Sequence, residues 1–258
     1  FTDAGLSPGG DMKDGKRTWT QAVPLGRFEI TGPVKIAVTI GGETVPWTQG
    51  EQIAVRAAMN GATSVRVDNV PLVFVGYGVD APERNWDDYK GVDLKGKIGI
   101  VLVNDPDFET GKGDFGGKAM TYYGRWTYKY EEAARRGAVG MLVVHETAPA
   151  SYGWATVKNS NTNTMFDIVR THPAEDHTLI EGWIQHDVAI DLFRRAGLDF
   201  AALKKTAQTR DFKAVELKGA GFSADYAVSS QVITSHNVVG RVEGAKRPNE
   251  TVIYSAHW

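Results

Sequence analysis

The residues of this sequence that could do chemistry are mainly histidines and carboxylates, because the chain contains no cysteine. The absence of cysteine excludes disulfides, thiolate metal sites and cysteine nucleophiles. His172, His177 and His186 lie near Glu175 and Asp176, a composition that could bind a metal ion. Zinc ligands, however, usually sit on preformed strands or one turn apart on a helix, and this segment has the composition of a loop. We therefore expect a solvated loop at residues 171–177.

A second candidate pair, His145 and Glu146, closes a predicted strand. The pair lacks the His-Glu-x-x-His spacing that places two zinc ligands on one helix face. A structural role is therefore favoured for both residues.

A glycine-rich stretch matches G-x-G-x-x-G through Gly111, Gly113 and Gly116. A dinucleotide site needs these glycines directly between a strand and a helix N-terminus, where free N–H groups face the pyrophosphate. Here Asp105 and Asp107 come just before the glycines, and the next predicted helix begins near residue 125. We expect a glycine-rich loop and no nucleotide site.

An aromatic and cationic cluster precedes that helix, formed by Tyr122, Tyr123, Arg125 and Trp126. Such residues usually pack in a core or under a helix. Aromatic side chains that flank an arginine at a loop–helix junction also suit ligand contact. Both interpretations stay open on the residues alone.

The elements around this cluster form a predicted βαβ unit. Residues 98–103 are a continuous apolar run, as in a strand buried on both faces, and residues 139–144 are a second such run. Between them, residues 126–136 have helical spacing, with Gly137 placed to end the helix. A connection of this kind makes the two strands parallel and the crossover right-handed.

The remaining elements are short strands and a few helices. We expect a hairpin at residues 34–47 that turns at Gly41-Gly42, a weak helical turn at 53–59, and irregular structure over 146–180. Helices are predicted at 187–196 and, capped by Asp199, through residue 203. The other predicted strands lie at residues 65–67, 72–75, 212–217, 227–233, 236–242 and 251–256. This mixture of many short strands with a few helices predicts an α+β or α/β fold with a β-rich module inserted into it.

Composition narrows the function classes. The chain has 258 residues and a net charge of −2, so no basic excess points to nucleic acid as a partner. No apolar stretch approaches 18 residues, so we expect no membrane span.

Two segments near the C-terminal end carry a family resemblance. Residues 236–244 (His-Asn-Val-Val-Gly-Arg-Val-Glu-Gly) and 250–258 (Glu-Thr-Val-Ile-Tyr-Ser-Ala-His-Trp) resemble the entry into the catalytic domain of co-catalytic zinc aminopeptidases. That family includes the glutamate-carboxypeptidase-like enzymes and the transferrin-receptor ectodomain. The inserted protease-associated (PA) domain of many members is similar to four further segments of this chain, at residues 71–79, 86–91, 94–98 and 132–140.

The resemblance implies a domain arrangement. Residues 33–230 would form the PA domain, a β-rich sandwich or open barrel with flanking helices. Residues 1–32 and 231–258 would belong to the start of the zinc-peptidase α/β domain into which it is inserted.

The resemblance also implies an activity, which is aminopeptidase-type hydrolysis of peptides by a water activated by two zinc ions. His257 is the one position that carries over as a zinc ligand, and no catalytic residue carries over onto this chain. The aspartate that would orient His257 would come directly after Trp258. We therefore expect the polypeptide as it stands to be inactive and the parent protein to be an enzyme.

Further expectations follow from the family. The partners would be a peptide substrate and the remainder of the catalytic domain, and the location would be secreted or periplasmic, while no motif bears on the oligomeric state. Because the PA domain covers the mouth of the active site in relatives, Tyr122, Tyr123, Arg125 and Trp126 are candidates for substrate access.

The alternative is a non-catalytic binding protein, because the transferrin-receptor branch has this architecture without the zinc ligands. A weaker alternative is a peptide-docking role for the fragment alone. An Asp directly after residue 258 and a Glu-Glu pair further on would indicate the enzyme.

Overall fold

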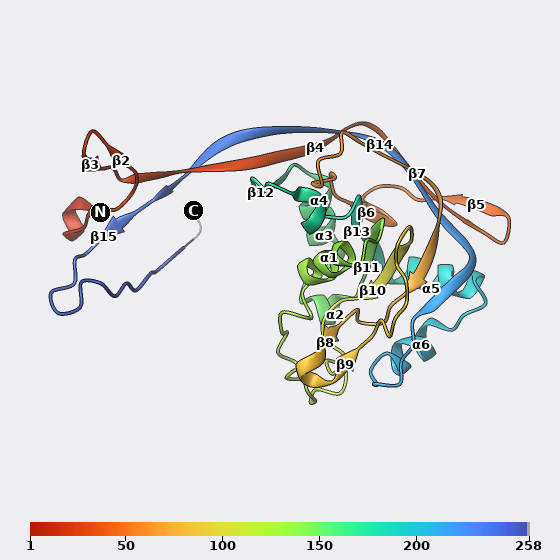
Figure 1. The fold of residues 1–258 in the computed structure, drawn as a ribbon. Helices are drawn as coiled ribbons and strands as arrows, with labels where there is room; N and C mark the ends of the chain where they lie inside the picture. The colour runs from red at the N-terminus through yellow and green to blue at the C-terminus, as the bar shows by residue number, and fades with distance from the viewer. Residues whose placement is uncertain (257–258) are drawn as a thin grey trace. The chain divides into compact units, whose positions relative to one another are not determined.

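The computed structural model describes residues 1–256 (Figure 1). The chain forms two compact units, one of residues 27–231 and one that joins residues 1–26 to the segment from Val232 onward. The division falls within two long strands, β4 (Thr20–Ile40) and β14 (Val215–Val238).

The larger unit has a mixed α+β architecture based on one open sheet. Its strand order is β12-β4-β14-β7-β10-β11-β13-β6, and β5 pairs with β4 at the side (Figure 1). Strands β7, β10, β11 and β13 are parallel, whereas β14 and β6 run antiparallel to their neighbours β7 and β13. Besides β4 and β14, the strands of this sheet are β5 (Glu43–Pro46), β6 (Ile53–Val55), β7 (Ser64–Phe74), β10 (Ile98–Leu102), β11 (Gly140–His145), β12 (Met165–Ile168) and β13 (Ile180–Gln185).

Helices cover both faces of this sheet, which explains the continuous apolar runs. Because side chains alternate between the faces of a strand, Ile100 joins one hydrophobic cluster and Val101 the other. The first cluster includes Phe193 of α5 and Phe200 of α6, and the second includes Tyr130 of α1. The helices are α1 (Trp126–Arg135), α2 (Thr147–Ala150), α3 (Trp154–Thr162), α4 (Pro173–Asp176), α5 (His186–Arg195) and α6 (Phe200–Thr206). A small hairpin of β8 (Asp80–Ala81) and β9 (Trp86–Asp87) encloses the 3-10 turn η2 (Pro82–Arg84).

The predicted βαβ unit is confirmed. Strands β10 and β11 pair in parallel from Ile98 opposite Gly140, and α1 connects them. Tyr130 fixes α1 to the sheet, because its hydroxyl donates a hydrogen bond to the Gly182 carbonyl of β13 at 3.0 Å. After the last turn, Gly137 has φ of 66°, a left-handed conformation that suits glycine.

Other local predictions are also confirmed. The hairpin of β4 and β5 turns at Gly41-Gly42, and both glycines have positive φ. Asp199 caps α6, because its Oδ1 accepts a hydrogen bond from the Ala202 N–H at 3.1 Å.

Three predictions of local structure are wrong. Residues 53–55 form strand β6, because pairing with β13 outweighs the helical preference of an alanine-containing segment. The region 146–180 contains α2, α3, β12 and α4 where irregular structure was expected. Residues 251–256 form no strand, and Val252, Ile253 and Tyr254 are 77%, 82% and 95% exposed. An apolar run becomes a buried strand only where a neighbour pairs with it, and residues 1–250 supply none.

The smaller unit joins the two ends of the described chain. Strand β1 (Ser7–Pro8) pairs antiparallel with β15 (Gly240–Arg241), and β2 (Met12–Lys13) pairs with β3 (Lys16–Arg17). The unit also has a 3-10 turn, η1 (Thr2–Ala4). The Val239 N–H donates to the Trp19 carbonyl at 2.8 Å, and the Gly9 N–H donates to the Val239 carbonyl at 3.0 Å.

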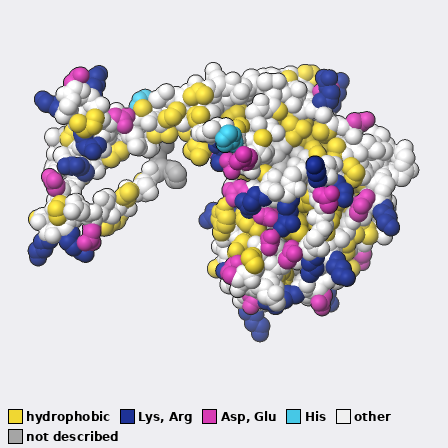
Figure 2. Space-filling model, in the orientation of Figure 1, with side chains coloured by type: hydrophobic (Ala, Val, Ile, Leu, Met, Phe, Trp, Pro, Cys, Tyr) yellow, Lys and Arg dark blue, Asp and Glu magenta, His cyan; other side chains and the backbone are white. Residues whose placement is uncertain are grey.

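Two surface properties bear on the expected partners. Acidic and basic side chains are interspersed over the face of the larger unit that Figure 2 shows. Among residues 1–256, no helix has the length and apolar character needed to cross a bilayer.

Candidate functional site

The three aromatic candidates at the loop–helix junction before α1 lie in two aromatic clusters, Tyr122 and Tyr123 in one and Trp126 in the other. Tyr123 belongs to the first, where its ring meets Tyr128 edge-on at 5.1 Å and its hydroxyl donates to Glu83 Oε1 at 2.9 Å. Tyr122 is 54% exposed, and its hydroxyl donates to a carboxylate of α1, Glu131. The hydrogen bond to Glu131 raises the pKa of Tyr122, and partial burial followed by the hydrogen bond to Glu83 raises the pKa of Tyr123.

Trp126 lies in the second cluster. The guanidinium of Arg56 stands 4.8 Å from the Trp126 ring and donates to Glu181 Oε2 at 3.2 Å. Arg125 is the N-cap residue of α1 and is exposed. The structure therefore leaves Tyr122 and Arg125 open to solvent, while Tyr123 and Trp126 are half-buried in packing contacts. A role of these residues in substrate access stays a prediction.

The predicted zinc ligand, His257, lies outside the described residues. Within residues 1–256, no three His, Asp or Glu side chains come together in a way that could hold a metal ion. The resemblance to a zinc site therefore depends on the sequence motif.

The carboxylate of Asp107 binds backbone amides of the glycine-rich loop. Asp107 Oδ2 accepts hydrogen bonds from the Phe115 N–H at 2.8 Å and the Gly117 N–H at 3.1 Å. These amides, which would face a phosphate in a dinucleotide site, are thus already bound by an anionic side chain.

The prediction of a solvated loop is wrong for His177, which belongs to an ionic network. Its Nδ1 lies 3.0 Å from Glu181 Oε1, and its Nε2 lies 2.9 Å from Asp167 Oδ2. The His177 side chain is only 11% exposed. Arg56 pairs with Glu181 and Arg170 pairs with Asp167, so each carboxylate also contacts an arginine. Spacing in the sequence does not reveal this network, because Asp167 and Glu181 lie on different strands, β12 and β13, and only the path of the chain between them brings both carboxylates to His177.

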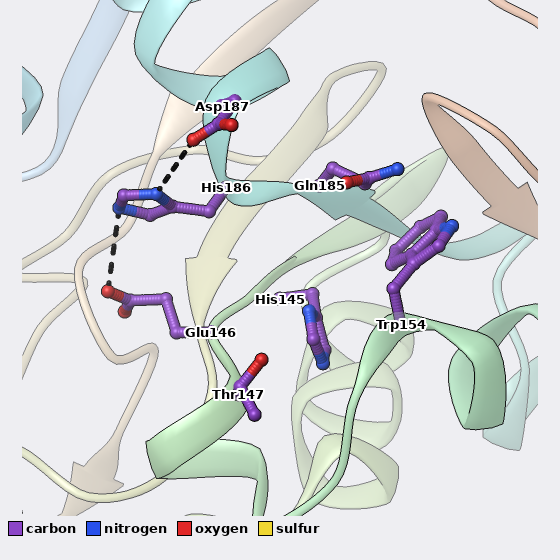
Figure 3. Close-up of a pocket in the computed structure, with 7 residues that line it drawn as sticks. All are labelled: His145, Glu146, Thr147, Trp154, Gln185, His186 and Asp187. Carbon is purple, nitrogen blue, oxygen red and sulfur yellow. Dashed lines mark hydrogen bonds and ion pairs between the residues drawn. The ribbon is translucent and has the colours of Figure 1, made fainter.

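A polar cavity of about 290 Å³ opens where β11 and β13 end (Figure 3). The two strands are parallel, and their last residues, His145 and Gln185, are partners in register. The chain turns into α2 after His145 and into α5 after Gln185, so the residues that follow each strand meet at one edge of the sheet. Side chains from the two strand ends and from α3 line the cavity, namely His145, Glu146, Thr147, Trp154, Gln185, His186 and Asp187.

Carboxylates dominate the charge around this cavity. Lys204 of α6 contacts two of them, with Nζ at 2.7 Å from both Glu146 Oε1 and Glu109 Oε1. Burial by itself would lower the pKa of Lys204, but the hydrogen bonds to Glu109 and Glu146 outweigh it and raise that pKa. His186 places Nε2 at 3.6 Å from Glu146 Oε1 and Nδ1 at 3.3 Å from Asp187 Oδ1. Burial, and then the charge of Glu109 and Glu146, raise the pKa of the nearby Tyr77.

The sequence alone does not predict this cavity, because the His145-Glu146 pair and His186 lie in segments that no motif connects. A usable signal existed, because each of two apolar runs ends in His or Gln followed by an acidic residue within two positions. Recognising it required knowing that these two strands are neighbours.

A scan against protein-family models and a search of curated proteins each found no match. Among solved structures, the chain is similar to an aminopeptidase from Aneurinibacillus sp. strain AM-1, with 16% sequence identity and a TM-score of 0.40. That similarity covers 95% of this chain and 41% of the aminopeptidase, so the chain spans less than half of that protein's length.

Proposed function

We propose that this chain is part of a zinc-dependent exopeptidase, and that its larger unit is a PA domain inserted near the start of the catalytic domain. The parent protein would remove amino-terminal residues from peptides. The alternative is a non-catalytic binding protein of the transferrin-receptor type, and the test below separates the two.

The observation that carries the proposal is the way in which the chain enters and leaves the larger unit. Residues 27–231 begin within β4 and end within β14, which are neighbours in the sheet. Ser7 and Pro8 pair with Arg241 and Gly240, across more than 230 residues of sequence. A module inserted into a host domain has this connectivity, because the chain must leave the host and return to it at nearby points.

The motifs of the resemblance follow the return of the chain. Residues 236–244 include the end of β14 and all of β15, and residues 250–258 come next. In the proposed enzyme His257 would bind zinc, and the metal would supply an activated water near neutral pH. This chain's own contribution would be the inserted domain, with Tyr122 and Arg125 exposed for contact with a peptide.

The test uses the natural gene product that carries this chain. Bound zinc is measured by mass spectrometry, and amino-terminal release from short peptides is followed with and without 1,10-phenanthroline. We expect about two zinc ions per chain, chelator-sensitive release, and loss of both zinc and activity in His257→Ala. His172→Ala is the matched control, because His172 is exposed and its side chain makes no hydrogen bond within residues 1–256, so it should behave as the wild type.

Two results would contradict the proposal. A folded gene product without zinc and without peptidase activity would favour the binding-protein alternative. A 258-residue chain that alone held two zinc ions and cleaved peptides would overturn the assignment of this chain as an inactive part of the enzyme.

A further inference from the structure

We propose that the cavity at the ends of β11 and β13 binds an alkylammonium group, as carried by a lysine side chain or a peptide amino terminus. The proposal concerns a binding site within the larger unit. It does not depend on peptidase activity, and its test is made on this chain alone.

Three donor groups of the cavity wall, on His145, Trp154 and Gln185, are already engaged in hydrogen bonds. The ring N–H groups of His145 and Trp154 and the side-chain amide of Gln185 each donate to a backbone carbonyl outside the cavity wall. The acceptors are the carbonyl oxygens of Tyr152, at 2.9 Å from His145 Nε2, of Gly50, at 3.0 Å from Trp154 Nε1, and of Glu51, which contacts Gln185 Nε2. Because a carbonyl oxygen can only accept, the bond to Tyr152 fixes the proton of neutral His145 on Nε2.

Hydrogen-bond acceptors of the cavity wall remain free. His145 is 5% exposed, and none of the hydrogen bonds among residues 1–256 engages its Nδ1, which keeps a lone pair. Figure 3 shows the amide nitrogen of Gln185 turned away from the side where His145 and His186 lie, which leaves the amide oxygen on that side. The carboxylates of Glu146 and Asp187 add further acceptor oxygens, of which Glu146 Oε1 already contacts Lys204 and Asp187 Oδ1 lies beside His186.

The side chains around the cavity carry a net negative charge. The carboxylates of Glu109, Glu146 and Asp187 face one ammonium, that of Lys204, and His186 adds a positive charge only when it is protonated. The site therefore keeps a net negative charge in either protonation state of His186. Because the N–H of Trp154 is used elsewhere, what this residue offers to a ligand is its aromatic face, which attracts cations.

These properties select one class of ligand. An anion would meet carboxylates, and an apolar group would make no use of the free acceptor on His145 Nδ1 or of the negative charge of the site. A metal ion lacks a ligand set, since residues 1–256 bring no three suitable side chains together. An alkylammonium group supplies three donors and a positive charge, and its methylene stem can lie along Trp154.

The test is a titration of the ¹⁵N-labelled chain followed by ¹H–¹⁵N NMR. Three probes separate the two sources of the ammonium group. Nα-acetyl-lysine methylamide carries only the side-chain ammonium, glycinamide carries only the terminal ammonium, and Nα-acetyl-norleucine methylamide is a neutral analogue of the first. We expect at least one ammonium probe to shift the amides of residues 145–147 and 185–187, and the neutral probe to shift none.

Variants identify the site. Glu146→Gln, which keeps the size and a contact to Lys204, should weaken binding about tenfold or more, because a charge-assisted hydrogen bond is lost. Asp187→Asn should weaken it about two- to fivefold, because this side chain is 95% exposed and water screens its charge. Asp187 is too exposed for its replacement to threaten folding. Asp211→Asn is the matched control, since Asp211 is exposed, lies outside the cavity and carries the same charge.

The outcomes decide the matter. The site is supported if an ammonium probe binds and if Glu146→Gln and Asp187→Asn both weaken that binding while Asp211→Asn leaves it unchanged. Any one of three results would overturn the ammonium site. The norleucine probe could cause equal shifts, neither cavity variant could change the affinity, or neither ammonium probe could cause a shift at millimolar concentration. The result stands apart from zinc content and peptide hydrolysis, so the two proposals can fail separately.

Discussion

The ionic network at His177 makes the stability of the larger unit depend on pH. Both ring nitrogens face carboxylate oxygens, Glu181 at 3.0 Å and Asp167 at 2.9 Å. A neutral imidazole has one N–H, so both contacts are hydrogen bonds only when the ring is protonated. Burial alone would lower the pKa of His177, but the hydrogen bonds and charges of Glu181 and Asp167 outweigh it and raise that pKa.

The direction in which stability changes with pH follows from the linkage between proton binding and folding. A histidine whose pKa is higher in the folded state binds its proton more tightly there, so folding is favoured while the ring is charged. The contribution is complete below the unfolded pKa of about 6.5 and disappears as the pH rises through the folded pKa. Stability attributable to His177 therefore falls from about pH 6.5 upward.

The perturbation is His177→Gln, which keeps one donor and removes the charge. Because Arg56 and Arg170 still pair with the two carboxylates, the variant loses about one charge-assisted hydrogen bond, roughly 2–3 kcal/mol at pH 6. As the pH rises through the raised pKa of His177, the wild-type ring loses its charge, and the difference should shrink to about 1 kcal/mol or less. For a unit of this size, the loss at pH 6 corresponds to a fall in melting temperature of about 5–10 °C.

The assay is thermal unfolding of the wild type and the variant at pH 6, 7, 8 and 9, with His172→Gln as the matched control. His172 is exposed, so its variant should stay within about 0.5 kcal/mol of the wild type at every pH. NMR titration of the His177 ring should place its pKa above about 6.5. A destabilisation of His177→Gln that is the same at pH 6 and pH 9 would refute the reasoning.

Three further predictions follow from single contacts. Tyr130→Phe removes a buried hydrogen bond to Gly182 at 3.0 Å and should lower the free energy of unfolding by about 1–2 kcal/mol. Denaturant titration measures this difference, and no change would show that the bond contributes little. Asp107→Ala leaves two buried amides without an acceptor and should expose the loop 110–117 to limited proteolysis. Resistance equal to that of the wild type would show that the Asp107 carboxylate does not hold this loop in place. If the larger unit shapes substrate access, Arg125→Ala in the natural gene product should change KM or peptide preference at unchanged zinc content, and identical kinetics on several peptides would remove that role.

Local signals predicted the elements whose causes lie within a few residues. The helix before Gly137, the cap at Asp199 and the turn at Gly41-Gly42 all formed as expected, because backbone conformation and capping are decided by neighbours in the chain. The run 98–102 was also predicted correctly, since a strand covered on both faces needs continuous apolar residues.

The wrong predictions of secondary structure have a different cause, which is the presence or absence of a distant strand to pair with. Residues 53–55 became a strand through pairing with β13, well over one hundred residues away, and the apolar run 251–256 lacked any such partner among the described residues. Strand pairing supplies hydrogen bonds and burial that no local window contains, so local propensity was overruled in one case and left without support in the other.

The same distinction separates the candidate sites. The sequence by itself determined which side chains exist to do chemistry and the positions of the parallel strands β10 and β11. Tertiary structure alone decided that His177 lies between two carboxylates and that the residues after His145 meet those after Gln185. The physical reason is that charges and hydrogen-bond partners act over a few ångströms in space, and the path of the folded chain, which no spacing in the sequence records, determines which residues come that close.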